Sequence, residues 1–350
     1  MNEDFFRQVF GGSWITQGLW VAAELGIADL LADGPRTAGA LAESTKADSG
    51  ALYRLLRALA SVGILARDAQ GRFSLTPMGN LLRGDVAGSQ RALATMMGAE
   101  FHQAWGELLD SVRTGEPGFE KRFGRSFFQY ATENPERHRI YDAAMTGVHG
   151  PETQPMLDAY DFGASGTVMD IGGGNGLTLC AILERHPSMQ GILFELPAVA
   201  DRARSTISAL GLSDRCRVEG GDFFASVPAG ADVYLMRHVI HDWEDRDAIA
   251  ILRNCREAMS PDGKLLVVET VIPPGDGPCF GKWLDLMMLL VGGRERTEEE
   301  YRRLFSEAGL SLSRVVPTAS EVSILEGEPA PSQHRGCGAH RVEELAPAPR

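Results

Sequence analysis

The hydrophobic pattern of the chain changes near residue 166. Before that point, apolar residues recur at helical spacing: Leu52, Leu55, Leu56 and Leu59 form one apolar stripe. After that point, short apolar runs alternate with longer amphipathic segments. This order predicts a mainly α-helical N-terminal part followed by a mostly parallel sheet with helices on both faces.

Residues 1–100 have the element order of a winged helix. A short helix capped by Thr37 precedes a second helix, and two strand-like runs, 64–66 and 73–76, follow around a turn. In residues 101–160, apolar positions from Phe101 to Val112 predict one long amphipathic helix. More helical sequence follows, with breaks at Asn134-Pro135 and Gly150-Pro151.

Residues 161–326 carry the strand–helix alternation and predict a doubly wound, Rossmann-like sheet, which binds ligands at the carboxyl ends of its strands. The predicted strands are Thr167–Ile171, Gly191–Leu196, Cys216–Glu219, Asp232–Met236, Lys264–Thr270 and Leu312–Val316. Residues 327–350 are rich in Pro and Gly and predict a disordered tail.

Length, charge and cysteine content limit the classes of protein to which the chain can belong. A chain of 350 residues favours two domains, and a net charge of −13 disfavours a nucleic-acid partner. No apolar run reaches the ~18–20 residues of a membrane span, and the first residues lack a secretion signal. Five scattered cysteines indicate a reducing compartment. We therefore expect a cytoplasmic enzyme that acts on a small molecule.

A glycine-rich turn follows the first predicted strand. Gly172, Gly173, Gly174 and Gly176 allow the backbone to approach a ligand closely. A dinucleotide fingerprint that starts at Gly172 requires glycine or alanine where Leu177 stands, so the pyrophosphate interpretation fails.

Acidic residues around this turn favour a cationic ligand. Asp170 would repel a diphosphate but would attract the ammonium and sulfonium groups of S-adenosylmethionine. Glu195 ends the second strand and can accept hydrogen bonds from ribose hydroxyls. After the third strand, Asp222 can accept from an adenine amino group and Phe223 can stack on its ring. Each of these residues, taken alone, could have a purely structural role. Their order, each after a successive predicted strand, predicts an S-adenosylmethionine site.

His241 follows the fourth strand at the same edge and is the candidate general base, because a histidine can take a phenolic proton near neutral pH. His238 lies nearer the strand and is interpreted as structural. Glu269 and Glu295 are candidates to orient the ring of His241. The alternative for Glu295 is a surface pair with Arg294 or Arg296.

The chain resembles the caffeate-type O-methyltransferases of bacteria and plants over roughly residues 10–326. The motifs that carry the resemblance are Asp-Ile-Gly-Gly-Gly-Asn-Gly (170–176), Phe-Glu-Leu-Pro (194–197), Gly-Gly-Asp-Phe-Phe (220–224), His-Asp-Trp (241–243), Glu-Thr-Val-Ile-Pro (269–273) and Gly-Gly-Arg-Glu-Arg-Thr (292–297). The resemblance implies His241 as base between Glu269 and Glu295. It also implies a cofactor site lined by Asp170, Gly172, Gly174, Glu195, Asp222, Phe223 and Arg237. The family usually has aspartate where Glu195 stands and often lysine where Arg237 stands.

The same resemblance implies a homodimer whose N-terminal helices interlock. It places the acceptor among the helices of 101–160 and 286–291, a setting suited to a flat aromatic hydroxyl compound. The expected substrate-binding residues are Trp105, Phe127, Met145, Asp242 and Met288.

Two other functions stay open at this point. Some members of the family perform non-methylating chemistry on polyketides, but those tend to lose the basic histidine. A winged-helix regulator that senses a ligand would need more basic residues on its recognition helix than Arg54 and Arg57. In the tail, His334, Cys337 and His340 have ligand-like spacing, yet we expect no metal site there.

Overall fold

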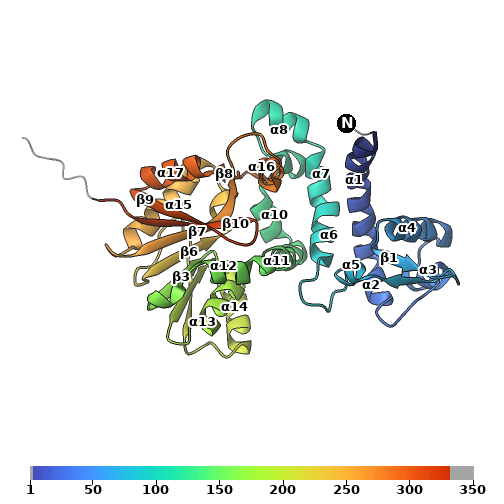
Figure 1. The fold of residues 1–350 in the computed structure, drawn as a ribbon, viewed down its shortest axis with the longest axis horizontal. Coiled ribbons are helices and arrows are strands. Elements are labelled where there is room, and N and C mark those ends of the chain that lie inside the picture. The colour runs from blue at the N-terminus through green and yellow to red at the C-terminus, as the bar shows by residue number, and fades with distance from the viewer. Residues whose placement is uncertain (1–2, 332–350) are drawn as a thin grey trace, which may run out of the picture.

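The computed structural model describes residues 3–331 (Figure 1). Its N-terminal part is a winged helix, as predicted. Thr37 caps the third helix by accepting a hydrogen bond from the Ala40 amide, and Leu52, Leu56 and Leu59 are buried. The elements are α1 (Glu3–Glu24), α2 (Ile27–Leu30), α3 (Ala38–Thr45), α4 (Ser49–Ser61), β1 (Leu65–Arg67), β2 (Phe73–Leu75) and α5 (Pro77–Asn80).

Helix α1 exposes a row of large apolar side chains. Val9, Phe10 and Trp14 are 54%, 64% and 75% exposed, and Ile15 lies beside them. Large apolar side chains that are exposed over neighbouring turns of one helix are typical of a surface that associates with another protein.

A group of helices connects the N-terminal part to the sheet (Figure 1). Its aromatic residues form one cluster in which Phe101, Phe119 and Phe127 contact one another edge to face. The elements are α6 (Arg91–Gly98), α7 (Glu100–Trp105), α8 (Leu108–Thr114), α9 (Gly118–Phe123), α10 (Phe127–Glu133), α11 (Pro135–His149), η1 (Gly150–Glu152), α12 (Thr153–Ala159) and η2 (Phe162–Ala164).

The prediction of one long helix over 101–112 is wrong. The helix ends after Trp105, where the Gly106 and Glu107 amides bond to carbonyls three residues back and tighten the last turn. Glycine lowers helix propensity at that point. Helix α8 then takes a new direction and leaves Leu109 and Val112 exposed.

The C-terminal sheet has the order β5-β4-β3-β6-β7-β10-β9, and strands β3 to β7 along it are parallel. Helices α12, α13 and α14 cover one face, and α15 and α17 cover the other (Figure 1). This confirms the predicted doubly wound, Rossmann-like fold. The strands are β3 (Thr167–Ile171), β4 (Gln190–Glu195), β5 (Cys216–Gly220), β6 (Val233–Arg237), β7 (Lys264–Ile272), β8 (Arg296–Thr297), β9 (Leu310–Pro317) and β10 (Val322–Pro329), and the helices are α13 (Leu177–Arg185), α14 (Pro197–Ala209), η3 (Ile240–Asp242), α15 (Asp245–Ala258), α16 (Phe280–Val291) and α17 (Glu298–Glu307).

Strand β10 was absent from the predicted strands. It pairs antiparallel with both β7 and β9, and its pairing with β9 shifts register between Glu326 and Gly327. The strand continues to Pro329, so it includes the first three residues assigned to the disordered tail. His334, Cys337 and His340 lie outside the described residues. None of the helices in residues 3–331 has the length and apolar character needed to cross a membrane.

Candidate active site

The glycine turn after β3 has a backbone conformation that favours glycine. Gly172 and Gly174 have φ angles of 69° and 58°, which favour glycine. A Cβ on Gly173 would lie 2.4 Å from Oδ2 of Asp170, whereas one on Gly174 would meet nothing within 4 Å. The backbone of Gly174 is therefore open to a ligand.

Asp170 and Glu195 sit on either side of this turn. Asp170 is buried, its Oδ2 has no hydrogen-bond partner, and burial raises the pKa of this carboxyl to about 7. Glu195 Oε2 accepts from the Gly174 amide at 3.1 Å, and Oε1 accepts from the Leu196 amide at 2.7 Å. These acids have lone pairs left for ammonium and hydroxyl donors, so the residues present fit S-adenosylmethionine.

Asp222 and Phe223 lie at the same edge. Asp222 is exposed, with Oδ1 accepting from the Phe224 amide at 2.8 Å, which leaves Oδ2 for a ligand. The half-buried ring of Phe223 approaches the glycine turn, since a Cβ on Gly172 would lie 3.8 Å from it.

Arg237 is turned toward the connecting helices. Its Nη1 donates to the hydroxyls of Thr153 and Thr178, and Nη2 donates to the His149 carbonyl and to Glu152 Oε2, the latter at 2.9 Å. These contacts tie the end of β6 to the α11–α12 segment. The role of Arg237 in cofactor binding stays a prediction.

Glu269 holds the turn that carries His241. Its Oε1 accepts from the amides of Val239, Ile240 and His241 at 3.1, 2.9 and 3.2 Å. The three amides converge on this one oxygen at the start of η3. The carboxylate that was expected to orient the ring of His241 thus orients its backbone, with Oε2 lying 3.6 Å from His241 Nδ1.

The ring of His241 is buried among carboxylates. Nδ1 lies 2.7 Å from Glu295 Oε1, and Nε2 lies 3.6 Å from Asp242 Oδ1, beyond hydrogen-bond distance. Burial alone would lower the pKa of His241, but the charges of Glu269, Asp242 and Glu295 raise it to about 10. The surface pairing of Glu295 with Arg294 or Arg296 does not occur, because Glu295 is buried against His241.

Two residues without a predicted role fix the same turn. Arg296 is fully buried and donates to the carbonyls of Ile240 and Trp243 at 3.2 and 2.7 Å. Gly293 lies so close to His241 that an added Cβ would be 2.1 Å from its carbonyl oxygen. Both belong to the 292–297 motif, but a motif match does not show which of its residues is buried.

The expected substrate-binding residues occupy different surroundings. Phe127 and Met145 belong to the aromatic cluster of the connecting helices, and Met288 is buried on α16. Trp105 is half-buried at the end of α7, outside that cluster. Asp242 lies beside Nε2 of His241.

Sequence models of two domains match the chain. The O-methyltransferase domain matches residues 105–311, more than half of the chain, and the O-methyltransferase dimerisation domain matches residues 7–85. The chain belongs to the O-methyltransferase family.

Individual known proteins match nearly the whole chain. Phenazine O-methyltransferase PhzM from Lysobacter antibioticus is 47% identical over 323 residues, 92% of this chain and 95% of that protein. Aclacinomycin 10-hydroxylase RdmB from Streptomyces purpurascens is 41% identical over 310 residues, 86% of this chain and 83% of that protein. The structure of NcsB1 from neocarzinostatin biosynthesis, with S-adenosylmethionine and 2-hydroxy-5-methyl naphthoic acid, is 37% identical with a TM-score of 0.80, covering 90% of this chain and 96% of NcsB1.

These matches confirm the enzyme class. The chain is an S-adenosylmethionine-dependent O-methyltransferase of the natural-product type, with the predicted cofactor. The match to the dimerisation domain confirms the predicted homodimer.

Proposed function

We propose that this O-methyltransferase methylates a hydroxyl on a small, flat aromatic acceptor and that His241 is the general base. The observation that carries the proposal is the asymmetry of the His241 ring. Nδ1 is bound to Glu295 at 2.7 Å, while Nε2 makes no hydrogen bond to any residue that the structure describes. Nε2 is therefore the nitrogen left to take a proton.

The carboxylates around His241 suit that role. A base that accepts a proton becomes an imidazolium, and the carboxyl groups of Glu295 and Asp242 beside the ring favour the cation. Glu295 also fixes the ring orientation, as in other base–carboxylate pairs. Glu269 and Arg296 hold the backbone, so the ring does not have to reorganise when the proton arrives.

The cofactor supplies an activated methyl group on a sulfonium when it is bound. We propose that Asp170 and Glu195 receive its ammonium and ribose groups, that the Gly172–Gly174 backbone accommodates its chain, and that Asp222 and Phe223 receive its adenine. The unpartnered Asp170 Oδ2 and the open space at Gly174 support this assignment. The protein contributes alignment, exclusion of water and a place for the proton.

The acceptor is assigned to the aromatic cluster beside the His241 turn. Phe128 of α10 stacks on Trp243, with ring centroids 5.7 Å apart, which brings the connecting helices against the base. Phe127 and Met145 belong to this cluster, and Met288 lies near the His241 turn, since a Cβ added at Gly293 would be 2.9 Å from its Cε. The names of PhzM and NcsB1 support aromatic acceptors such as phenazines and naphthoates.

The test is a methyl-transfer assay with labelled cofactor over hydroxylated phenazines, naphthoates and simple phenols. We expect His241→Ala to lower kcat/KM by about 10²–10⁴-fold on the best acceptor, the size of a general-base contribution. The control is His102→Ala, which removes an exposed histidine on α7. Full activity of His241→Ala would refute the base assignment.

A second candidate function is non-methylating chemistry on a polyketide. The name of RdmB, aclacinomycin 10-hydroxylase, supports hydroxylation as that chemistry. Mass analysis of the product separates the two functions, because methylation adds CH₂ and hydroxylation adds O.

We also infer a cytoplasmic setting. The four cysteines in residues 3–331, Cys180, Cys216, Cys255 and Cys279, are free thiols, which supports a reducing compartment.

A further inference from the structure

A second buried histidine, His238, lies beside the proposed base. Its backbone is left-handed, with φ of 53°, and Lys46 is the other non-glycine residue with positive φ within residues 3–331. This conformation turns the chain so that the next three amides converge on Glu269. Strain held at such a point is a sign that the placement of the residue matters.

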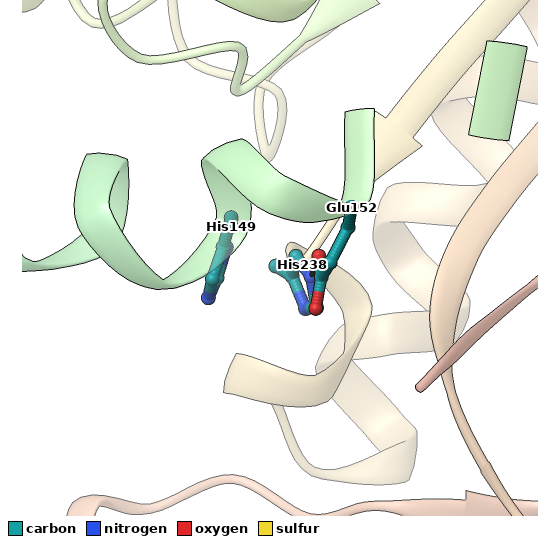
Figure 2. Close-up of side chains that lie close together, drawn as sticks. All are labelled: His149, Glu152 and His238. Carbon is teal, nitrogen blue, oxygen red and sulfur yellow. Dashed lines mark hydrogen bonds and ion pairs between the residues drawn. The ribbon is translucent and has the colours of Figure 1, made fainter. Parts of the chain in front are cut away.

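The ring of His238 lies between two carboxyl groups. Nε2 is 2.7 Å from Glu152 Oε2 (Figure 2), and Nδ1 is 3.7 Å from Glu269 Oε2. Arg237 donates to the same oxygen of Glu152, so that oxygen is an acceptor and His238 donates to it from Nε2. A neutral imidazole that donates from Nε2 has a lone pair on Nδ1.

Nδ1 of His238 and Oε2 of Glu269 are both buried, and neither has a hydrogen-bond partner. If Glu269 were ionised, two acceptors would face each other in a dry interior, which is unfavourable. A bridging water needs a separation of about 4.5 Å, since it makes two bonds of about 2.8 Å at a wide angle. A proton on Oε2 instead makes one O–H···N hydrogen bond after the side chains approach by about 1 Å.

A metal ion accounts for the surroundings of His238 less well than a proton on Glu269 does. One group of potential ligands is His149, Glu152 and His238 (Figure 2), but the guanidinium of Arg237 already occupies the carboxylate oxygen of Glu152. The other group is His238, His241 and Glu269. A metal on Nδ1 of His241 would leave the ring proton on Nε2, and the ring could then not act as a base.

We propose that His238 and Glu269 share one buried proton, carried on Oε2 of Glu269, which keeps this carboxyl neutral and leaves Glu295 as the ionised partner of His241. The proposal rests on the proposed base role of His241. It makes His238 a positioning residue that acts on the base through Glu269.

The consequence concerns the pKa of His241. Burial lowers the pKa of His241, and Glu269 is the largest of the charges that raise it. A neutral Glu269 removes that charge, so His241 can be unprotonated when the acceptor binds. Burial raises the pKa of Glu269 to about 7 and lowers the pKa of His238, and both shifts agree with a proton on the carboxyl.

Charged and titratable groups face this proton from each neighbouring element. They are His149 and Glu152 of α11 and η1, Arg237 of β6, His241 and Asp242 of η3, Glu295 and Arg296 near β8, and Tyr301 of α17.

The decisive variant is Glu269→Gln. Its carboxamide oxygen can accept from the same three amides, and its NH₂ can donate to Nδ1 of His238 as the neutral acid does. We expect the acid limb of the kcat/KM profile to stay within about 0.3 pH units of wild type. A downward move of about one unit or more, a tenfold change in proton affinity, would show that Glu269 is charged in the wild type and would overturn the proposal.

The matched control is Glu295→Gln. It removes a carboxylate that we assign as ionised, so the acid limb should move to lower pH by about one unit or more. This shift shows that the assay responds to a charge beside His241. If the limb does not move in the control, Glu295 is not the ionised partner and the proposal fails.

Infrared spectroscopy tests the proton without any activity. The purified wild-type chain should show the carbonyl stretch of a buried protonated carboxyl, lost in Glu269→Gln and kept in Glu295→Gln. Absence of that band, or one equivalent of tightly bound divalent metal, overturns the proposal. If the band is present but His241→Ala keeps full activity, the proposed base fails alone.

Discussion

Gly293 packs against the backbone of the turn that carries His241, and Gly293→Ala tests whether this contact positions the turn. The added Cβ would lie 2.1 Å from the His241 carbonyl oxygen and 2.9 Å from Cε of Met288. The methionine can move, but the carbonyl belongs to backbone that also accepts from the Arg294 amide at 2.8 Å. Restoring a contact of about 3.4 Å requires a displacement of about 1.3 Å.

A displacement of about 1 Å at reacting groups costs on the order of 10²-fold in rate. We therefore expect Gly293→Ala to lower kcat/KM about 10²-fold and to lower the unfolding free energy by about 1–3 kcal/mol, the cost of overpacking. The assays are steady-state methyl transfer and urea unfolding followed by circular dichroism. The control is Gly277→Ala, where an added Cβ meets nothing within 4 Å. A folded Gly293→Ala variant with activity within about threefold of wild type would refute the reasoning.

Three further outcomes follow from buried polar contacts. Arg296→Met should lower the unfolding free energy by about 3 kcal/mol or more, because the Ile240 and Trp243 carbonyls lose a buried donor; an unchanged urea midpoint would contradict this. Thr297→Ala removes the capping box of α17 and should cost about 1 kcal/mol in the same assay, whereas Thr297→Ser should keep most of it. Burial alone would raise the pKa of Glu326, but hydrogen bonds from Arg314 and Tyr160 lower it below the usual 4.5. The ionised form of Glu326 therefore stabilises the fold above that pH, and this contribution is lost as the pH falls. The stability difference between wild type and Glu326→Gln should therefore shrink from about pH 7 to about pH 4, and a constant difference would show that ionisation of Glu326 does not matter.

Much of the sheet could be predicted, because its strands are short apolar runs bounded by turns. The bounds of β3 agree with the prediction at both ends. β10 could not be predicted from the same pattern, because Glu326 is buried there through partners that lie elsewhere: Tyr160, Lys264 and Arg314. The break at Gly106 was equally hard to foresee, since a single glycine inside a helical pattern is often tolerated.

At the candidate site, the sequence predicts which residues lie at the same edge of the sheet, but it does not predict which side chains contact one another. Acids that follow parallel strands meet at one edge, so Asp170, Glu195 and Asp222 could be grouped from the sequence. The partner of His238 could not be identified, because Glu152 lies 86 residues away on a short helical turn. The sequence also presents Glu269 and Glu295 as equivalent acids. Their different roles depend on which oxygen meets a backbone amide and which meets a ring nitrogen.

The apolar row on α1 has a consequence for measurement. If Val9, Phe10, Trp14 and Ile15 are covered by a second copy of the chain, the folded state is linked by mass action to protein concentration. The midpoint of thermal unfolding then rises with enzyme concentration. A rate constant measured at high dilution combines the association equilibrium with the chemistry.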